Sequence, residues 1–237
     1  MRLEKKKKLR PGARCPWNSR ARRPCHGANG SEAVISLPKQ NNYQVALDEA
    51  WAALRSRPAA ELEQLGAEPL GGERWSLPVL KARFELDRQR GTVEVAGVGA
   101  ASVWWSILAL HYLQARVPVA AARRWISFEE IPAARGYAAP YRGRVIGLFC
   151  GTVGRTRESL LSAAAGQGAE VAGEGEATVE LQVFPLVPLR IVWYGGDEEL
   201  PPGATFLYGD NVAGILAVED IVVCAERVVA RLRGKPW

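Results

Sequence analysis

The sequence predicts an α+β fold, in which a mainly antiparallel sheet packs against several helices in a single domain. Residues 178–184 and 189–194 are rich in Val, Ile and aromatic side chains, which favour strands. Residues 75–95 alternate apolar and charged positions between turns, which is typical of strands with one face in solvent. Residues 103–115 and 218–233 carry apolar side chains at helical spacing.

The positive charge of the chain is concentrated at its N-terminus. Residues 1–40 hold eleven Lys or Arg and two Glu, whereas the other 197 residues hold twenty Lys or Arg and twenty-three acids, a net charge of −3. The tail lacks apolar periodicity, so we expect residues 1–40 to be a disordered basic tail and 41–237 to be the folded domain. Nucleic acid would then bind only through the tail. An alternative interpretation is that translation starts further downstream than Met1. Since Met1 is the only methionine, such a start would use another codon, at a residue such as Val34, Leu37 or Val45.

Composition also bears on location and cofactors. No apolar run approaches the roughly 18 residues of a membrane span, and no apolar segment follows the basic cluster as in a secretory signal. Cys15, Cys25, Cys150 and Cys224 form no CxxC pair, which argues against zinc or iron–sulfur ligation by this chain alone. We expect a cytoplasmic protein with reduced thiols and no membrane contact, and the sequence assigns no cofactor.

The first half of the domain reads as helix, meander and helix. Asn41 or Asn42 can cap a helix over residues 43–55, and a short helix over 59–65 lies between Pro58 and Gly66. Strands are expected over 75–80, 82–87 and around Val93 and Val95. Ser102 can cap the helix over 103–115, whose predicted buried face consists of Trp104, Ile107, Leu108, His111 and Ala115.

The second half begins with a short extended piece at residues 125–128, followed by a Gly- and Pro-bearing loop. A helix is expected to start near Thr156 and end at Ala165, and residues 172–177 form a polar connector. After the two strongest strands, a third short strand should end at Asp210. The last helix, residues 218–233, carries Glu219 and Asp220 in its first turn, which suits the helix dipole. Cys224 neighbours its buried face and is interpreted as packing.

Three groups of residues are candidates for chemistry. His111 is the histidine of the predicted domain and could be a ligand or a general base, although a hydrogen-bonded core histidine is the simpler interpretation. Tyr137, Tyr141 and Arg142, with Arg144, lie in the predicted loop. They could clamp an anionic or planar ligand, or pin that loop to the domain.

The third group is the acidic loop Asp197, Glu198 and Glu199, with Asp210 at the end of the following strand. These carboxylates could act as acid and base or hold a cation, and alternatively they form a solvated turn. The helix start after GTVGRT could hold an anion, but the P-loop lysine is missing. We expect the acidic loop and the arginine-bearing loops to meet at one rim of the domain.

Several segments in order resemble the DUF3786 family: ILALHYL, WISFEEIP, YAAPYRGRV and WYGGDEELPPGATFLYGDNVAGIL, followed by a closing helix. The resemblance covers roughly residues 43–233. It implies relatives mostly from anaerobic bacteria and archaea, some with an N-terminal iron–sulfur region, and a role near iron–sulfur or corrinoid metabolism. This chain departs from that arrangement, because Cys15 and Cys25 with His26 do not supply a four-cysteine motif. The resemblance implies no catalytic residues.

Two function classes follow. The preferred hypothesis is a domain that binds a small ligand or a redox or iron–sulfur protein partner without chemistry of its own, since no known catalytic motif is present. The alternative is an enzyme that uses the acidic loop and His111 as acid and base groups.

Overall fold

The computed structural model describes residues 41–172 and 177–237, and all of them belong to one compact unit. The fold is α+β, as predicted, with two antiparallel sheets rather than one. The basic tail and the centre of the predicted polar connector lie outside the described residues, so the domain boundary at residue 40 stays a prediction.

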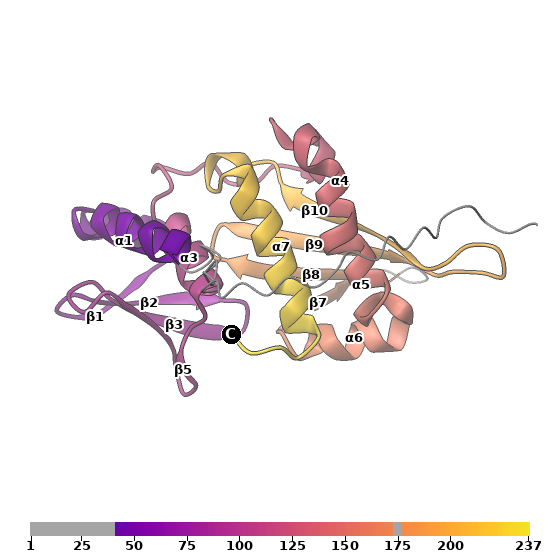
Figure 1. Ribbon diagram of the computed structural model, residues 1–237, viewed down its shortest axis with the longest axis horizontal. Coiled ribbons are helices and arrows are strands. Elements are labelled where there is room, and N and C mark those ends of the chain that lie inside the picture. The colour runs from indigo at the N-terminus through magenta and orange to yellow at the C-terminus, as the bar shows by residue number, and fades with distance from the viewer. Residues whose placement is uncertain (1–40, 173–176) are drawn as a thin grey trace, which may run out of the picture. The chain divides into compact units, whose positions relative to one another are not determined.

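The larger of the two sheets contains the strands that the sequence indicates most strongly. Its order is β6–β10–β9–β8–β7, and every neighbouring pair is antiparallel (Figure 1). Alternate residues of β9 point into the core, from Val187 to Trp193, because side chains of a strand alternate between its faces. The strands span Trp125–Ser127 (β6), Glu170–Ala172 (β7), Thr178–Phe184 (β8), Val187–Tyr194 (β9) and Gly203–Gly209 (β10).

The other sheet is a meander in the order β1–β2–β3–β4–β5. The three predicted strands are confirmed as β2, β3 and β4, and the alternation of buried Phe84 and Leu86 with more exposed neighbours gives β3 one wet face. The two edge strands were not predicted, because they are short and fully exposed and carry no apolar pattern. The strands span Glu68–Gly71 (β1), Arg74–Val79 (β2), Ala82–Asp87 (β3), Thr92–Val95 (β4) and Gly99–Ala100 (β5).

The predicted helices are present with small changes at their ends. They are Asn41–Arg55 (α1), Ala59–Gln64 (α2), Val103–Tyr112 (α3), Arg157–Ala165 (α6) and Val218–Leu232 (α7). Thr156 caps α6 as expected, because its hydroxyl oxygen accepts a hydrogen bond from the Ser159 amide at 3.2 Å. In Figure 1, α7 crosses the face of the larger sheet that Leu148–Cys150 (α5) and α6 also cover. None of the helices in the described part is long and apolar enough to cross a membrane.

The predicted buried face of α3 is partly wrong. Trp105, Leu108, Ala109 and Tyr112 are buried, whereas Trp104, Ile107 and His111 are partly exposed. Because this helix is apolar nearly all round, the spacing of its apolar residues fits more than one face. His111 therefore reaches the surface between α3 and α7 and is not a core residue.

The segment predicted as a Gly- and Pro-bearing loop is mostly helical. It contains Ala134–Tyr137 (η2), Ala138–Tyr141 (α4), a π-helical turn over Arg142–Gly147 (η3) and Leu148–Cys150 (α5). Tyr141, Val145 and Phe149 recur at every fourth position and are buried. Pro140 falls in the first turn, where a missing amide hydrogen costs no helical bond, so this proline does not prevent the helix.

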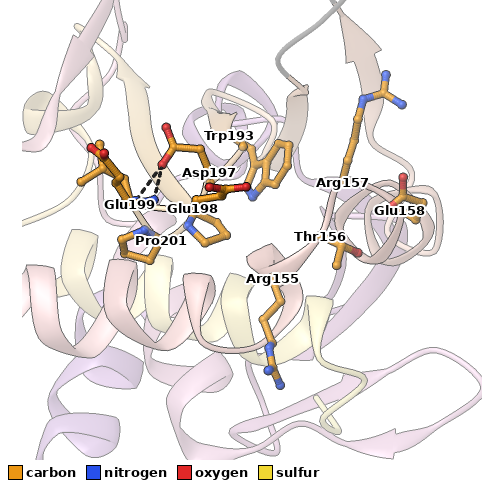
Figure 2. A pocket seen from close by; sticks show the side chains of 13 residues that line it. Arg155, Thr156, Arg157, Glu158, Trp193, Asp197, Glu198, Glu199 and Pro201 are labelled. Atoms are coloured by element: carbon orange, nitrogen blue, oxygen red, sulfur yellow. Dashed lines mark hydrogen bonds between the residues drawn. The ribbon is translucent and has the colours of Figure 1, made fainter.

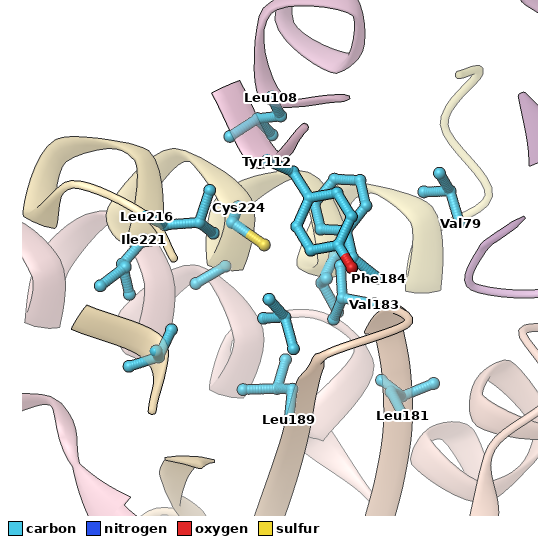
Figure 3. Close-up of a cluster of buried hydrophobic side chains, with 14 of the residues drawn as sticks. Val79, Leu108, Tyr112, Leu181, Val183, Phe184, Leu189, Leu216, Ile221 and Cys224 are labelled. Atoms are coloured by element: carbon cyan, nitrogen blue, oxygen red, sulfur yellow. The ribbon is translucent and has the colours of Figure 1, made fainter. Parts of the chain in front are cut away.

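The two sheets meet at the end of α3. The ring of Tyr112 stacks on Phe184 of β8 with centroids 4.6 Å apart, and its hydroxyl donates to the Leu65 carbonyl at 2.6 Å. The Leu80 amide donates to the Val183 carbonyl at 3.1 Å, which ties the turn after β2 to β8. Figure 3 shows Tyr112 and Phe184 in the same buried cluster as Ile221 and Cys224 of α7. One shared core therefore supports both sheets.

Gly66 is required where α2 ends. Its φ is +81°, and an added Cβ would lie 2.6 Å from the Cβ of Pro185. We expect Gly66→Ala to lower the free energy of unfolding by about 2 kcal/mol or more, because strain and overpacking act together. Gly143→Ala is the matched control, since Gly143 is helical with open space at its Cβ; it should change stability by less than about 1 kcal/mol. Urea unfolding measures both, and equal effects would contradict this account.

Candidate functional site

The structure divides the predicted site residues between the two ends of the β9–β10 hairpin. Tyr194 pairs with Gly203 next to the acidic loop, and Leu189 pairs with Tyr208 at the other end. Because β10 has seven residues, Asp197 and Asp210 lie at ends separated by roughly 20 Å of strand. Arg142 lies near the Asp210 end, because its neighbour Tyr141 contacts Tyr208 there. The expectation that the acidic loop and the loop with Arg142 share one rim is therefore wrong.

The acidic loop forms one wall of a pocket of about 510 Å³ (Figure 2). The opposite wall is the start of α6, with Arg155, Thr156 and Arg157, so the helix start that the sequence suggested for anions does face the acids. Trp193 lines the pocket and is fixed by a 2.7 Å hydrogen bond from its indole nitrogen to the Gly154 carbonyl. Two features that the sequence indicated separately thus occur together.

Asp197 shapes the loop. Its Oδ1 accepts hydrogen bonds from the Glu199 and Leu200 amides at 2.9 and 2.7 Å, and these backbone donors lower the pKa of its carboxyl. An added Cβ at Gly196 would lie 2.7 Å from the Leu200 carbonyl oxygen, so the turn also needs this glycine. Asp197 is therefore committed to the turn.

The remaining charges around the pocket have no ion-pair partner among the described residues. Glu198 and Glu199 are exposed on the loop, and Arg155 and Arg157 flank Thr156. Figure 2 shows the two arginine side chains directed to opposite sides of Thr156, with Glu198 on the side of the loop toward Trp193. The pocket thus offers both signs of charge beside an indole.

The second group of predicted site residues, Tyr137, Tyr141 and Arg142, is held by contacts to other side chains of the protein. The Tyr137 hydroxyl donates to Oε1 of Glu219 at 2.5 Å, and the Tyr141 and Tyr208 hydroxyls are 2.9 Å apart. The Arg142 guanidinium lies 3.7 Å from Glu129. Burial raises the pKa of Tyr141 well above its usual value, so it stays protonated. These contacts fit the alternative that the segment is pinned to the domain.

Asp210 also forms hydrogen bonds within the protein. Its Oδ1 accepts from the Arg123 amide at 2.9 Å, and its own amide donates to the Arg124 carbonyl at 3.0 Å. The hydrogen bond from the Arg123 backbone lowers the pKa of the Asp210 carboxyl. Asp210 therefore anchors the segment that leads into β6.

His111 forms a hydrogen-bonded pair with a residue that the sequence did not single out as its partner. Its Nδ1 lies 2.9 and 3.0 Å from the two carboxylate oxygens of Asp220, in the first turn of α7. The side chains of His111 and Asp220 are 33% and 17% exposed. The hydrogen bond to Asp220 raises the pKa of His111 against the opposing effect of burial. Fixing Nδ1 leaves Nε2 as the ring nitrogen that can meet another molecule.

Within the described residues, no group of three or more His, Cys, Asp or Glu side chains could hold a metal ion. Cys224 is buried, and burial raises its thiol pKa to about 12, so it is unreactive and serves packing as interpreted. The tail residues Cys15, Cys25 and His26 lie outside the described part of the chain.

The comparisons with known proteins agree with the resemblance in the sequence. A family described as "Domain of unknown function (DUF3786)" matches residues 58–231. This range runs from the start of α2 almost to the end of α7, so it includes both sheets and both candidate regions. No curated protein and no solved structure matches the chain.

The His111–Asp220 pair predicts a pH dependence of stability. Because the folded state raises the pKa of His111, its stabilising contribution is complete below the unfolded pKa of about 6.5 and is lost as pH rises through the folded pKa. The stability difference between wild type and Asp220→Asn should therefore shrink between about pH 5 and pH 9. Urea unfolding across this range tests it, and NMR titration should show a raised His111 pKa that falls in the variant. A pH-independent difference would contradict the assignment.

Proposed function

From the premise that the chain belongs to the DUF3786 family, we propose that it is a binding domain for a small polar ligand, held between the acidic loop and the start of α6. The observation that carries the proposal is a pocket of about 510 Å³ in which charges of both signs, without ion pairs to other described residues, flank Trp193. This volume falls within the range of small-molecule sites.

The charges favour a ligand that itself carries both signs. Glu198 and Glu199 would receive a cationic group, while Arg155 and Arg157 at the opposite margin can swing toward an anionic group. The amides of Arg157 and Glu158, which precede the capped Ser159 amide in the first turn of α6, would add favourable interactions with the anion. The indole of Trp193 supplies an apolar surface between them.

The family resemblance adds a setting for the proposal. We propose that the protein acts in anaerobic metabolism near iron–sulfur or corrinoid chemistry. A redox or iron–sulfur protein is the alternative to a small ligand as its binding partner. Leu200, which follows the acids, is 67% exposed and would be covered by such a protein partner. We propose that binding occurs in the cytoplasm and does not require the basic tail.

Double substitution of the two free acids tests the pocket. Free α-amino acids and dipeptides serve as probes with both signs of charge, and we expect at least one to raise the Tm of the wild type. Glu198→Gln with Glu199→Gln should remove at least half of that rise, because the ligand's cationic group loses its partners. Glu63→Gln with Glu94→Gln is the control, since both residues are exposed without ion pairs elsewhere in the described structure. Equal responses of the two double variants would refute the proposal.

The His111–Asp220 pair favours an enzyme as the second candidate. A carboxylate that fixes Nδ1 prepares Nε2 to accept a proton, which is the arrangement of a general base. The acidic loop plays no part in this version, because Asp197 lies at the far end of the hairpin. Asp220 replaces it as the partner of His111.

A reaction that depends on this pair would respond to His111 and not to Asp197. His111→Gln should lower kcat about a hundredfold or more, as loss of a general base does, while the loss of the pair with Asp220 lowers the Tm but leaves the variant folded at the assay temperature. Asp197→Asn should leave kcat within about twofold. If both substitutions leave turnover intact, the enzymatic candidate fails and the binding proposal is unaffected.

A further inference from the structure

A smaller hollow lies at the other end of the larger sheet, away from the acidic-loop pocket. It has a volume of about 260 Å³ and is lined by residues of the segment before β6, by Trp125, and by Pro188 and Gly209. Gly209 pairs with Trp125, and Pro188 lies 3.3 Å from the position of an added Cβ on Gly209. The hollow therefore lies over the adjacent strands β6, β10 and β9.

A glycine is needed under this segment. An added Cβ at Gly209 would lie 2.7 Å from both the Cβ of Ala122 and Oδ1 of Asn211. Only a glycine lets the segment Ala120–Arg124 approach the sheet this closely. The position of this wall of the hollow thus depends on one residue in β10, which the sequence analysis does not single out.

Three hydrogen bonds hold the segment in place. Asp210 makes two of them, from the Arg123 amide to its carboxylate and from its own amide to the Arg124 carbonyl. The third joins the Asn211 side-chain amide to the Ala120 carbonyl at 3.1 Å. The backbone that carries Arg123 and Arg124 is therefore fixed before any ligand arrives, which lowers the cost of binding.

The charged and aromatic side chains that line the hollow are Arg123, Arg124 and Trp125, and two carboxylates lie behind Arg124. Arg123 is exposed and has no ion-pair partner in the described structure, and Arg124 is held only loosely, 3.4 Å from Glu130 and 3.9 Å from Asp210. The guanidinium carbon of Arg190 lies 4.3 Å from the centroid of the Trp125 ring. Glu180 pairs with Arg190, so the two arginines of the segment are the cations available to a ligand.

We propose that this hollow binds a nucleoside monophosphate, with the base against Trp125 and the phosphate on Arg123 and Arg124. A planar base suits an aromatic wall, and guanidinium groups bind phosphate through paired hydrogen bonds. The hollow is slightly smaller than the roughly 300 Å³ or more of usual small-molecule sites, so it can enclose the base while the phosphate lies on the arginines at its margin. This site is independent of the ligand proposed above.

Calorimetric titration of the full chain at physiological salt tests the site with AMP, adenosine and ribose 5-phosphate. AMP should bind one site at least tenfold more tightly than either fragment, because each fragment lacks one half of the recognised groups. Arg123→Gln with Arg124→Gln should weaken AMP binding at least tenfold. Trp125→Leu should weaken AMP and adenosine but leave ribose 5-phosphate within twofold, with folding verified by circular dichroism.

Arg116→Gln with Arg135→Gln is the matched control, since it removes the same charge from exposed positions without described ion pairs. This control variant should bind AMP within twofold of the wild type. Because all variants contain the basic tail, the tail cannot cause a difference between them. The proposal would be overturned if AMP shows no saturable binding or if only oligonucleotides bind. It would also be overturned if the two double arginine substitutions weaken AMP binding equally. Retention of AMP binding in the Glu198 and Glu199 double variant is expected, so the two proposals fail separately.

Discussion

The contact of Tyr112 with Phe184 and Leu65 is the constraint on which the rest of the structure depends. Tyr112 ends α3, Phe184 ends β8, and Leu65 follows α2, so a single side chain joins helices from the first half of the chain to the larger sheet. Burial raises the pKa of Tyr112, so its hydroxyl remains a donor to the Leu65 carbonyl. Replacing this ring would remove apolar contacts and leave a buried carbonyl without its partner.

The positions of both candidate sites follow from that core. Because β8 is fixed at its end by Phe184, the neighbouring β9–β10 hairpin extends in one direction only, with the acidic loop at its far end and Asp210 at its near end. Most predicted site residues then serve the fold: Asp197 closes a turn, Asp210 anchors a segment, and Tyr141 is buried against Tyr208. Among the predicted site residues, Glu198, Glu199 and Nε2 of His111 have no such role within the described structure.

Local patterns allowed much of the fold to be predicted. Thr156 at a helix start, the β-branched residues of β8 and β9, and the apolar stripe of α7 all specify structure over a few neighbouring residues. Prediction failed where local patterns permit several answers. The α3 helix is apolar nearly all round, and Gly and Pro in residues 136–147 suggested a loop where helical turns form.

The candidate sites were harder to predict, because their members are distant in sequence. His111 and Asp220 are 109 residues apart, and a first-turn aspartate reads equally well as a response to the helix dipole. Trp125 and Gly209 meet only through the pairing of β6 with β10. The acidic loop could be identified as polar and exposed, but which residues face it depends on the direction in which the hairpin leaves the core.

Native-state hydrogen exchange under increasing low concentrations of denaturant tests the shared core most directly. If one core supports both sheets, the buried amides of β3 and β9 should exchange through the same global opening, with equal free energies and equal denaturant dependence. Exchange of β3 at a distinctly lower free energy, while β9 keeps its protection, would show two independent cores and contradict the account.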